Sequence, residues 1–157
     1  VLNDALRWLG AEPEHYISAI PEPFTYVPDD ERAIELADGS ISSSFLEMFG
    51  RPARDTGTDS ERSGQPTDAQ RLYTLNSTDI RRMLETSPRL RAAIALRRGN
   101  RRDQVTAVYY MVLSRPPTPT EVATASAYLE AGGRTPKQAV EDLAWALINT
   151  KEFLCRH

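Results

Sequence analysis

The chain is poor in the residues that build metal and thiol chemistry. Cys155 is the only cysteine among 157 residues, so no disulfide can form within the chain and a multi-cysteine metal site is excluded. The two histidines, His15 and His157, lie far apart in sequence, which argues against a histidine-rich metal site. One cysteine also gives no indication of the redox compartment.

Long apolar runs are absent as well. No stretch of the sequence has the roughly 20 apolar residues that cross a bilayer, so we expect no membrane span. The N-terminus lacks the basic, apolar and small-residue pattern of a signal peptide. The first residue, Val1, is typical of a piece of a longer chain, and we expect the C-terminal part of a larger protein.

Lysine is scarce, and the charge is unevenly distributed. Arginine provides 17 of the 19 Lys and Arg residues. Residues 1–66 contain 13 acidic and 5 basic residues, whereas residues 67–157 contain 9 and 14. Because arginine forms bidentate pairs with carboxylates, we expect the two halves to pack on each other. A surface for a partner is the alternative.

Several segments show the apolar spacing of short helices. The stripe over residues 2–9 ends at Gly10, and Pro-rich residues 11–40 should wrap over a surface without long elements. Further helices are expected over 42–49, 67–84, 88–99 and 100–112. The apolar stripe of the second of these includes Leu72 and Tyr73. Asn76 falls on the same side, so that helix either breaks there or buries an amide.

The last third carries the clearest helix starts. Thr118-Pro-Thr-Glu121 and Thr135-Pro-Lys-Gln138 both have the pattern of a capping box with proline at the first helical position. A Gly-Gly pair at 132–133 separates the two helices, which predicts a helical hairpin. Trp145 and Ile148 widen the apolar face of the second helix, which we therefore expect to be buried on two sides. No segment alternates with a period of two residues, so a sheet is not expected. The predicted fold is all-α: one domain over 1–157, an irregular helical bundle with a Pro-rich N-terminal wrapping segment and a C-terminal hairpin.

Four blocks of sequence, in order, carry a family resemblance: FLEMFGRPARDTGTDSER, QPTDAQRLYTLNSTDIRRML, LSRPPTPTEVATASAYL and EDLAWALINTKEFLCRH. Together they resemble the C-terminal domain of unknown function of planctomycete-type exported proteins that carry c-type cytochrome modules. The resemblance implies haem elsewhere in the parent protein and a periplasmic or extracellular location. No haem is expected in this domain, because Cys-x-x-Cys-His is absent. The family has no known activity, so no catalytic residue transfers.

A polar segment over 51–62 is the most conspicuous candidate site. Its charged residues could form an Arg–carboxylate network that fixes the segment, while two amides form hydrogen bonds with polar groups that the network leaves unpaired. Alternatively, these residues could form a functional loop. The set consists of Arg51, Arg54, Asp55, Asp59, Glu61, Arg62, Gln70 and Asn76. We favour the structural network.

The segment matches parts of three known patterns of active or metal sites. Asp55-Thr56-Gly57 matches the aspartic-protease triplet, but that chemistry needs a second copy. Alternating Asp and Glu suggest a calcium loop, although the glycine is misplaced for an EF-hand. Asp55 and Glu61 could form a glycosidase pair, yet neighbouring arginines would lower both pKa values, which does not suit a general acid.

Other candidates have simpler interpretations. Eight arginines over 81–102 suggest nucleic-acid binding, but the segment has no aromatic residue and the chain is acidic overall, so we expect no nucleic acid. Trp8, Tyr109, Tyr110 and Trp145 are interpreted as core. Cys155 is interpreted as a small buried hydrophobe.

Taken together, the sequence predicts a non-catalytic helical accessory or interaction domain that binds other domains of its parent protein, with a polysaccharide or a redox partner also possible. The alternative is a carbohydrate-processing or metal-binding site on the 51–62 loop. No cofactor is expected in this domain.

Overall fold

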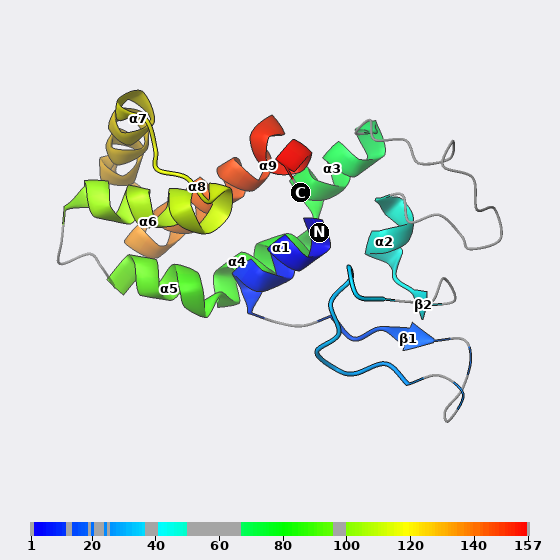
Figure 1. Ribbon diagram of the computed structural model, residues 1–157. Coiled ribbons are helices and arrows are strands. Elements are labelled where there is room, and N and C mark those ends of the chain that lie inside the picture. The colour runs from blue at the N-terminus through cyan, green and yellow to red at the C-terminus, as the bar shows by residue number, and fades with distance from the viewer. Residues whose placement is uncertain are drawn as a thin grey trace. The chain divides into compact units, whose positions relative to one another are not determined.

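The computed structural model describes residues 2–11, 14–18, 20, 24, 26–36, 41–49, 67–95 and 100–156 (Figure 1). The chain divides into two compact units. Unit 1 comprises residues 1–8 and 12–76, and unit 2 comprises residues 9–11 and 77–157. The single domain over 1–157 stays a prediction.

Unit 1 holds short elements. These are most of α1 (Leu2–Gly10), β1 (Ile17–Ser18), β2 (Ile41–Ser42), α2 (Ser44–Met48) and α3 (Asp68–Asn76). The two strands pair antiparallel, with Ile17 opposite Ser42. This ladder was not expected, since two residues per strand are too short for a period-two pattern. The all-α class is confirmed, because helices dominate the described chain.

Side-chain contacts hold unit 1 together locally. The buried Asn3 amide donates to the Tyr16 hydroxyl at 2.8 Å and also to Glu14. Burial, and then the nearby Glu14 carboxylate, raises the pKa of Tyr16 to about 12. The Phe45 ring stacks on Phe49 and meets Tyr73 edge-on, with centroids 4.3 and 5.8 Å apart. These contacts give unit 1 a small aromatic centre.

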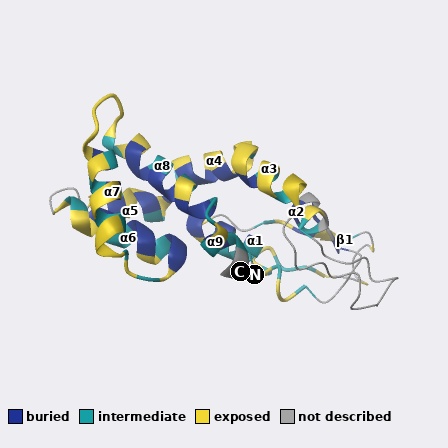
Figure 2. Cartoon of the chain, turned by 90° about the horizontal axis from the view of Figure 1, so that it is seen from above, coloured by how far each residue is buried: buried dark blue, intermediate teal, exposed yellow. Residues whose placement is uncertain are grey.

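Unit 2 is a bundle of six helices among the described residues. They are α4 (Thr78–Thr86), α5 (Pro88–Ala95), α6 (Arg101–Leu113), α7 (Pro119–Glu130), α8 (Pro136–Ile148) and α9 (Lys151–Arg156). Helix α8 is central, since α4, α5, α6, α7 and α9 all pack against it. Figure 2 shows the buried residues gathered on the inner faces of these helices. Val105, Val108, Val140, Ala144 and Ile148 are among the least exposed residues of this core.

The predicted helix starts of unit 2 are confirmed. Asn100 caps α6, and its side chain accepts a hydrogen bond from the Arg102 amide. Complete capping boxes open α7 at Thr118 and α8 at Thr135. These helices form the predicted hairpin, and the turn between them places Gly133 at φ +95°, a conformation that favours glycine. Helix α9 was not predicted.

Residues 9–11, at the end of α1, belong to unit 2 and make close contacts within it. The Ser87 hydroxyl is fully buried and donates to the Leu9 carbonyl at 2.6 Å. Gly10 lies so close to Met83 that an added Cβ would overlap the methionine side chain. This packing explains why the α1 stripe ends in a glycine.

Candidate functional site

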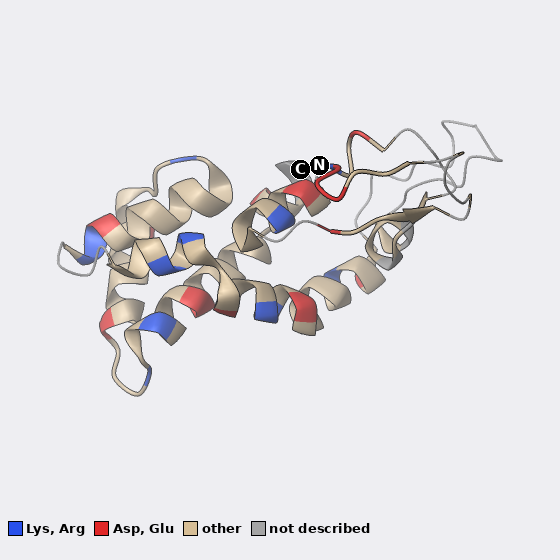
Figure 3. Cartoon of the chain, turned by 90° about the horizontal axis from the view of Figure 1, so that it is seen from below, with Lys and Arg blue, Asp and Glu red and all other residues tan. Residues whose placement is uncertain are grey.

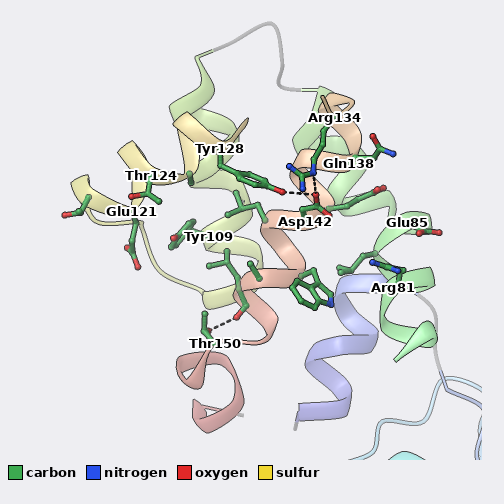
Figure 4. Close-up of a pocket in the computed structure, with 18 residues that line it drawn as sticks. Arg81, Glu85, Tyr109, Glu121, Thr124, Tyr128, Arg134, Gln138, Asp142 and Thr150 are labelled. Atoms are coloured by element: carbon green, nitrogen blue, oxygen red, sulfur yellow. Dashed lines mark hydrogen bonds and ion pairs between the residues drawn. The ribbon is translucent and has the colours of Figure 1, made fainter. Parts of the chain in front are cut away.

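An open groove of about 860 Å³ runs along α8 in unit 2 and is the candidate site. Residues of α8 form its floor, α7 lies along one side and α4 along the other. Figure 4 shows Glu121, Thr124 and Tyr128 on the α7 side and Arg81 and Glu85 on the α4 side. Tyr109 of α6 and Thr150 also contribute to the lining.

The floor is the outer face of α8. Gln138, Glu141, Asp142, Trp145 and Ala146 follow the spacing i, i+3, i+4, i+7 and i+8, so they lie on one side of the helix. The opposite side is buried in the bundle. The sequence predicted that this helix is buried on two sides. That prediction was wrong for the outer face, because Trp145 is half-buried and Ala146 is exposed. The polar residues at 138, 141 and 142 were the signal for an open face.

One wall of the groove is fixed by a three-residue contact between the two hairpin helices. The Tyr128 hydroxyl donates to Asp142 Oδ2 at 2.8 Å, and Arg134 Nε lies 3.0 Å from the same oxygen. The Arg134 guanidinium also lies over the Tyr128 ring, 5.2 Å from its centroid. Burial, and then the hydrogen bond to Asp142, raises the pKa of Tyr128. The phenol therefore stays protonated at neutral pH and remains a donor.

Arg115 fixes the other end of the groove, although it does not line it. Its guanidinium makes hydrogen bonds with all of its donor hydrogens: two to Glu121, two to Glu152 and one to the Pro116 carbonyl. The four carboxylate bonds measure 2.8 to 2.9 Å. Because Glu121 begins α7 and Glu152 belongs to α9, one arginine joins both helices to the end of α6. Arg115 was not singled out from the sequence.

The same contacts set the protonation of the site. Hydrogen bonds from Arg115, and then from the Thr118 backbone, lower the pKa of Glu121 to about 2. Hydrogen bonds to Glu121 and Glu152 raise the pKa of Arg115 further. Burial raises the pKa of Tyr109, whose ring lies 5.5 Å from the Arg115 guanidinium. Glu121 is therefore ionised at neutral pH and acts as a hydrogen-bond acceptor, which suits binding rather than proton donation.

The α4 wall is different, because no described residue pairs with its lining charges, Arg81 and Glu85. Arg81 and Glu85 lie one turn apart and are both exposed. Neither side chain forms a hydrogen bond or ion pair with the described residues. The groove thus has one wall of fixed charges and one wall whose charges can meet a ligand.

Most of the predicted 51–62 site lies outside the described residues. This holds for Arg51, Arg54, Asp55, Asp59, Glu61 and Arg62, so the polar-network and functional-loop hypotheses for them stay predictions. Gln70 and Asn76 are described. Gln70 Oε1 accepts from the Thr67 amide at 3.0 Å, and its Nε2 donates to the Met48 carbonyl at 3.1 Å. Gln70 therefore completes a capping box on α3 and satisfies one carbonyl.

Asn76 takes the first of its two predicted alternatives. Helix α3 ends at Asn76, whose side chain is exposed, and Ser77 caps α4 by accepting from the Ile80 amide at 3.3 Å. The apolar stripe predicted for α3 was wrong in one respect. Leu72 is 58% exposed, and Thr74 is the buried residue of that helix.

The aromatic residues interpreted as core divide into three groups. Tyr109 is buried, as predicted. Trp8 and Tyr110 are 50% and 52% exposed, so the prediction was wrong for them. Trp145 is half-buried and lines the groove. Apolar spacing identifies the side of a helix but not what covers that side, which explains the errors. The side chain of Cys155 lies outside the described residues.

The described residues contain neither a cluster that could hold a metal ion nor a helix that could span a membrane. No group of three His, Cys, Asp or Glu residues in this part of the chain is placed to hold a metal ion. No helix in the described ranges has the length and hydropathy of a membrane span. In Figure 3, the positions of basic and acidic residues alternate along the helices.

The fold and the groove define a helical protein in which contacts between helices hold one wall of an open groove. Residues 28–129 match the family model PSD1, described as "Protein of unknown function (DUF1553)". The match covers more than half of the chain, and the chain belongs to this family. It ends within α7, so α8 and α9 lie beyond it. No curated protein and no solved structure matches the chain.

Proposed function

We propose that this chain is a helical interaction module of a larger exported protein that also carries c-type cytochrome modules, and that it binds other domains of that parent. The family match supports a domain of unknown function. The four sequence blocks quoted above support the finer context of an exported, cytochrome-bearing parent. In this proposal, haem is bound elsewhere in the parent.

The observation that carries the proposal is the preformed groove of unit 2. Its floor belongs to the central helix, and internal hydrogen bonds hold its ends at Arg115 and Tyr128. A surface that is already ordered loses little conformational entropy when a partner binds. Its fixed carboxylates accept hydrogen bonds, whereas Glu121 cannot supply a proton near neutral pH. Recognition therefore fits the groove better than acid–base catalysis.

The experiment compares the separated parts of the parent protein. The chain is produced alone, the remaining domains are produced without it, and their association is measured by calorimetry and by size-exclusion chromatography. We expect saturable binding that weakens as salt rises, since charged groups rim the groove. A complete lack of association at low ionic strength would contradict the proposal, as would a parent sequence without any Cys-x-x-Cys-His motif.

A further inference from the structure

We infer that the groove along α8 binds one amphipathic helix of a partner polypeptide, and that this helix carries lysine or arginine toward the groove. The inference rests on the proposed interaction function and names the surface and the chemistry of its partner. Three features of the described residues support it: the shape of the groove, its small and apolar residues, and its charge.

The groove has the space to hold one further helix beside α8. Both α4 and α7 pack against α8, and the outer face of α8 between them is open. A helix with its side chains is about 10 Å wide and rises 1.5 Å per residue, so each residue fills roughly 120 Å³. The groove volume of about 860 Å³ therefore accommodates about two turns of helix.

Small side chains in the lining permit close approach of a partner. Ala146 on the floor and Thr120 and Thr124 on the α7 wall are small and exposed. Small side chains at a contact allow two helices to lie near the lower end of the usual separation of 8–10 Å. Trp145, which is half-buried, adds apolar surface to the lining. A partner helix would bury its apolar side chains here.

The charge of the groove is opposite to that of the unit around it. Residues 77–157 contain 13 basic and 8 acidic residues, whereas the lining contains four carboxylates and two guanidinium groups. Glu121 and Asp142 are already paired with arginine. No described residue donates a hydrogen bond to Asp142 Oδ1, and none donates to or pairs with the carboxylate of Glu85. These oxygens favour a cationic side chain.

A sugar ligand is the competing occupant, and the geometry favours it less. A sugar-binding platform uses an open aromatic face, but Arg134 covers one face of Tyr128 and Tyr109 is buried. Trp145 is left as a partly exposed aromatic residue in the lining. We therefore treat sugar binding as an outcome of the test that would overturn the inference.

The test uses Trp145 as its reporter. The chain contains two tryptophans, and Trp8→Phe leaves Trp145 alone. The probes are two synthetic amphipathic helices of about four turns, identical except that one carries Lys and the other Glu at every polar position facing the groove. We expect the Lys helix to shift Trp145 emission to shorter wavelength, and the Glu helix to bind about tenfold more weakly or not at all.

Two matched pairs of variants locate the binding. Ala146→Gln places a longer side chain on the floor, whereas Ala123→Gln makes the same change at an exposed position of α7 outside the lining. Glu85→Gln removes a groove carboxylate, and Glu130→Gln removes an exposed carboxylate outside it. We expect the first member of each pair to weaken binding of the Lys helix about tenfold and the second to leave it unchanged.

Three results would overturn the inference: equal binding of the Lys and Glu helices, equal effects within each pair, or a Trp145 shift with a neutral oligosaccharide but with neither helix. The same variants are measured against the remaining domains of the parent. If those domains bind but Ala146→Gln has no effect, the groove inference fails while the proposed function stands. If only the Lys helix binds, the groove inference stands and the proposed parent is wrong.

Discussion

Arg115 and Glu152 are 37 residues apart in sequence, yet the arginine donates two hydrogen bonds of 2.8 Å to the two oxygens of that carboxylate. The same guanidinium holds Glu121 in the same bidentate manner. Three helices of unit 2 therefore meet at one side chain. Replacing Arg115 should therefore weaken the contact between these helices.

Arg115→Lys should destabilise unit 2. An ammonium cannot hold two carboxylates with paired parallel hydrogen bonds, so Glu121 and Glu152 would keep their charges beside each other with fewer donors. We expect the free energy of unfolding to fall by roughly 1–3 kcal/mol. The measurement is urea unfolding followed by helical circular dichroism. Arg91→Lys, at an exposed position of α5, is the control and should change stability little; equal losses in both variants would contradict the prediction.

Glu121 should make stability depend on pH in the acid range. Its pKa in the folded chain is about 2, below the usual 4.5. A lowered pKa stabilises the folded state above the unfolded value, and this stabilisation disappears as the pH falls from 4.5 toward about 2. Glu121→Gln keeps a side chain that can cap the helix but removes the charge. The stability difference between the two proteins should therefore be largest at neutral pH.

Thermal unfolding over a pH series measures this difference. We expect it to shrink steadily below pH 4.5. The corresponding series for Glu130→Gln, at an exposed carboxylate without an ion pair to the described residues, should be nearly flat. A Glu121→Gln difference that stays constant down to strong acid would show that the carboxylate is not held by Arg115 as described.

Ser87→Ala should lower the free energy of unfolding by more than the removal of one oxygen atom suggests. The buried hydroxyl donates to the Leu9 carbonyl at 2.6 Å and accepts from the Leu90 amide at 3.2 Å. Alanine would leave both backbone groups buried without their partner, which costs roughly 1–3 kcal/mol. Urea unfolding is the measurement. Ser126→Ala, on the half-buried side of α7, should cost less than about 0.5 kcal/mol; comparable values for the two would contradict the assignment.

Gly10→Ala should be destabilising because of Met83. The added Cβ would overlap the methionine and lie 2.9 Å from its sulfur. A double-mutant cycle with Met83→Ala separates this clash from the general effect of alanine in a helix. We expect Gly10→Ala to destabilise the wild-type background by about 1–3 kcal/mol and to be neutral or stabilising when Met83 is Ala. Additive effects would exclude the clash.

Local patterns predicted the helix starts well. The two capping boxes, the cap at Asn100 and the break at Asn76 depend on residues within four positions of each other, and all four appear in the structure. These features are visible in sequence because the hydrogen bonds that make them are local.

Long-range features were not predictable in the same way. Glu121 was identified as a cap, but its second partner, Arg115, is recognisable only when the end of α6 meets α7 and α9. Likewise, the groove exists because nothing in the described chain covers the outer face of α8. Periodicity placed Trp145 beside apolar neighbours and gave no information about that missing cover.

Glu121 both caps the start of α7 and pairs with Arg115, so a change at one contact affects the other. One of its oxygens, Oε2, accepts from both the Thr118 amide and Arg115. Any change that separates α9 from Arg115 will therefore also weaken the hydrogen bonds at the first turn of α7. The rate of hydrogen exchange at the Thr118 amide should therefore report whether α9 is packed against Arg115, far along the chain.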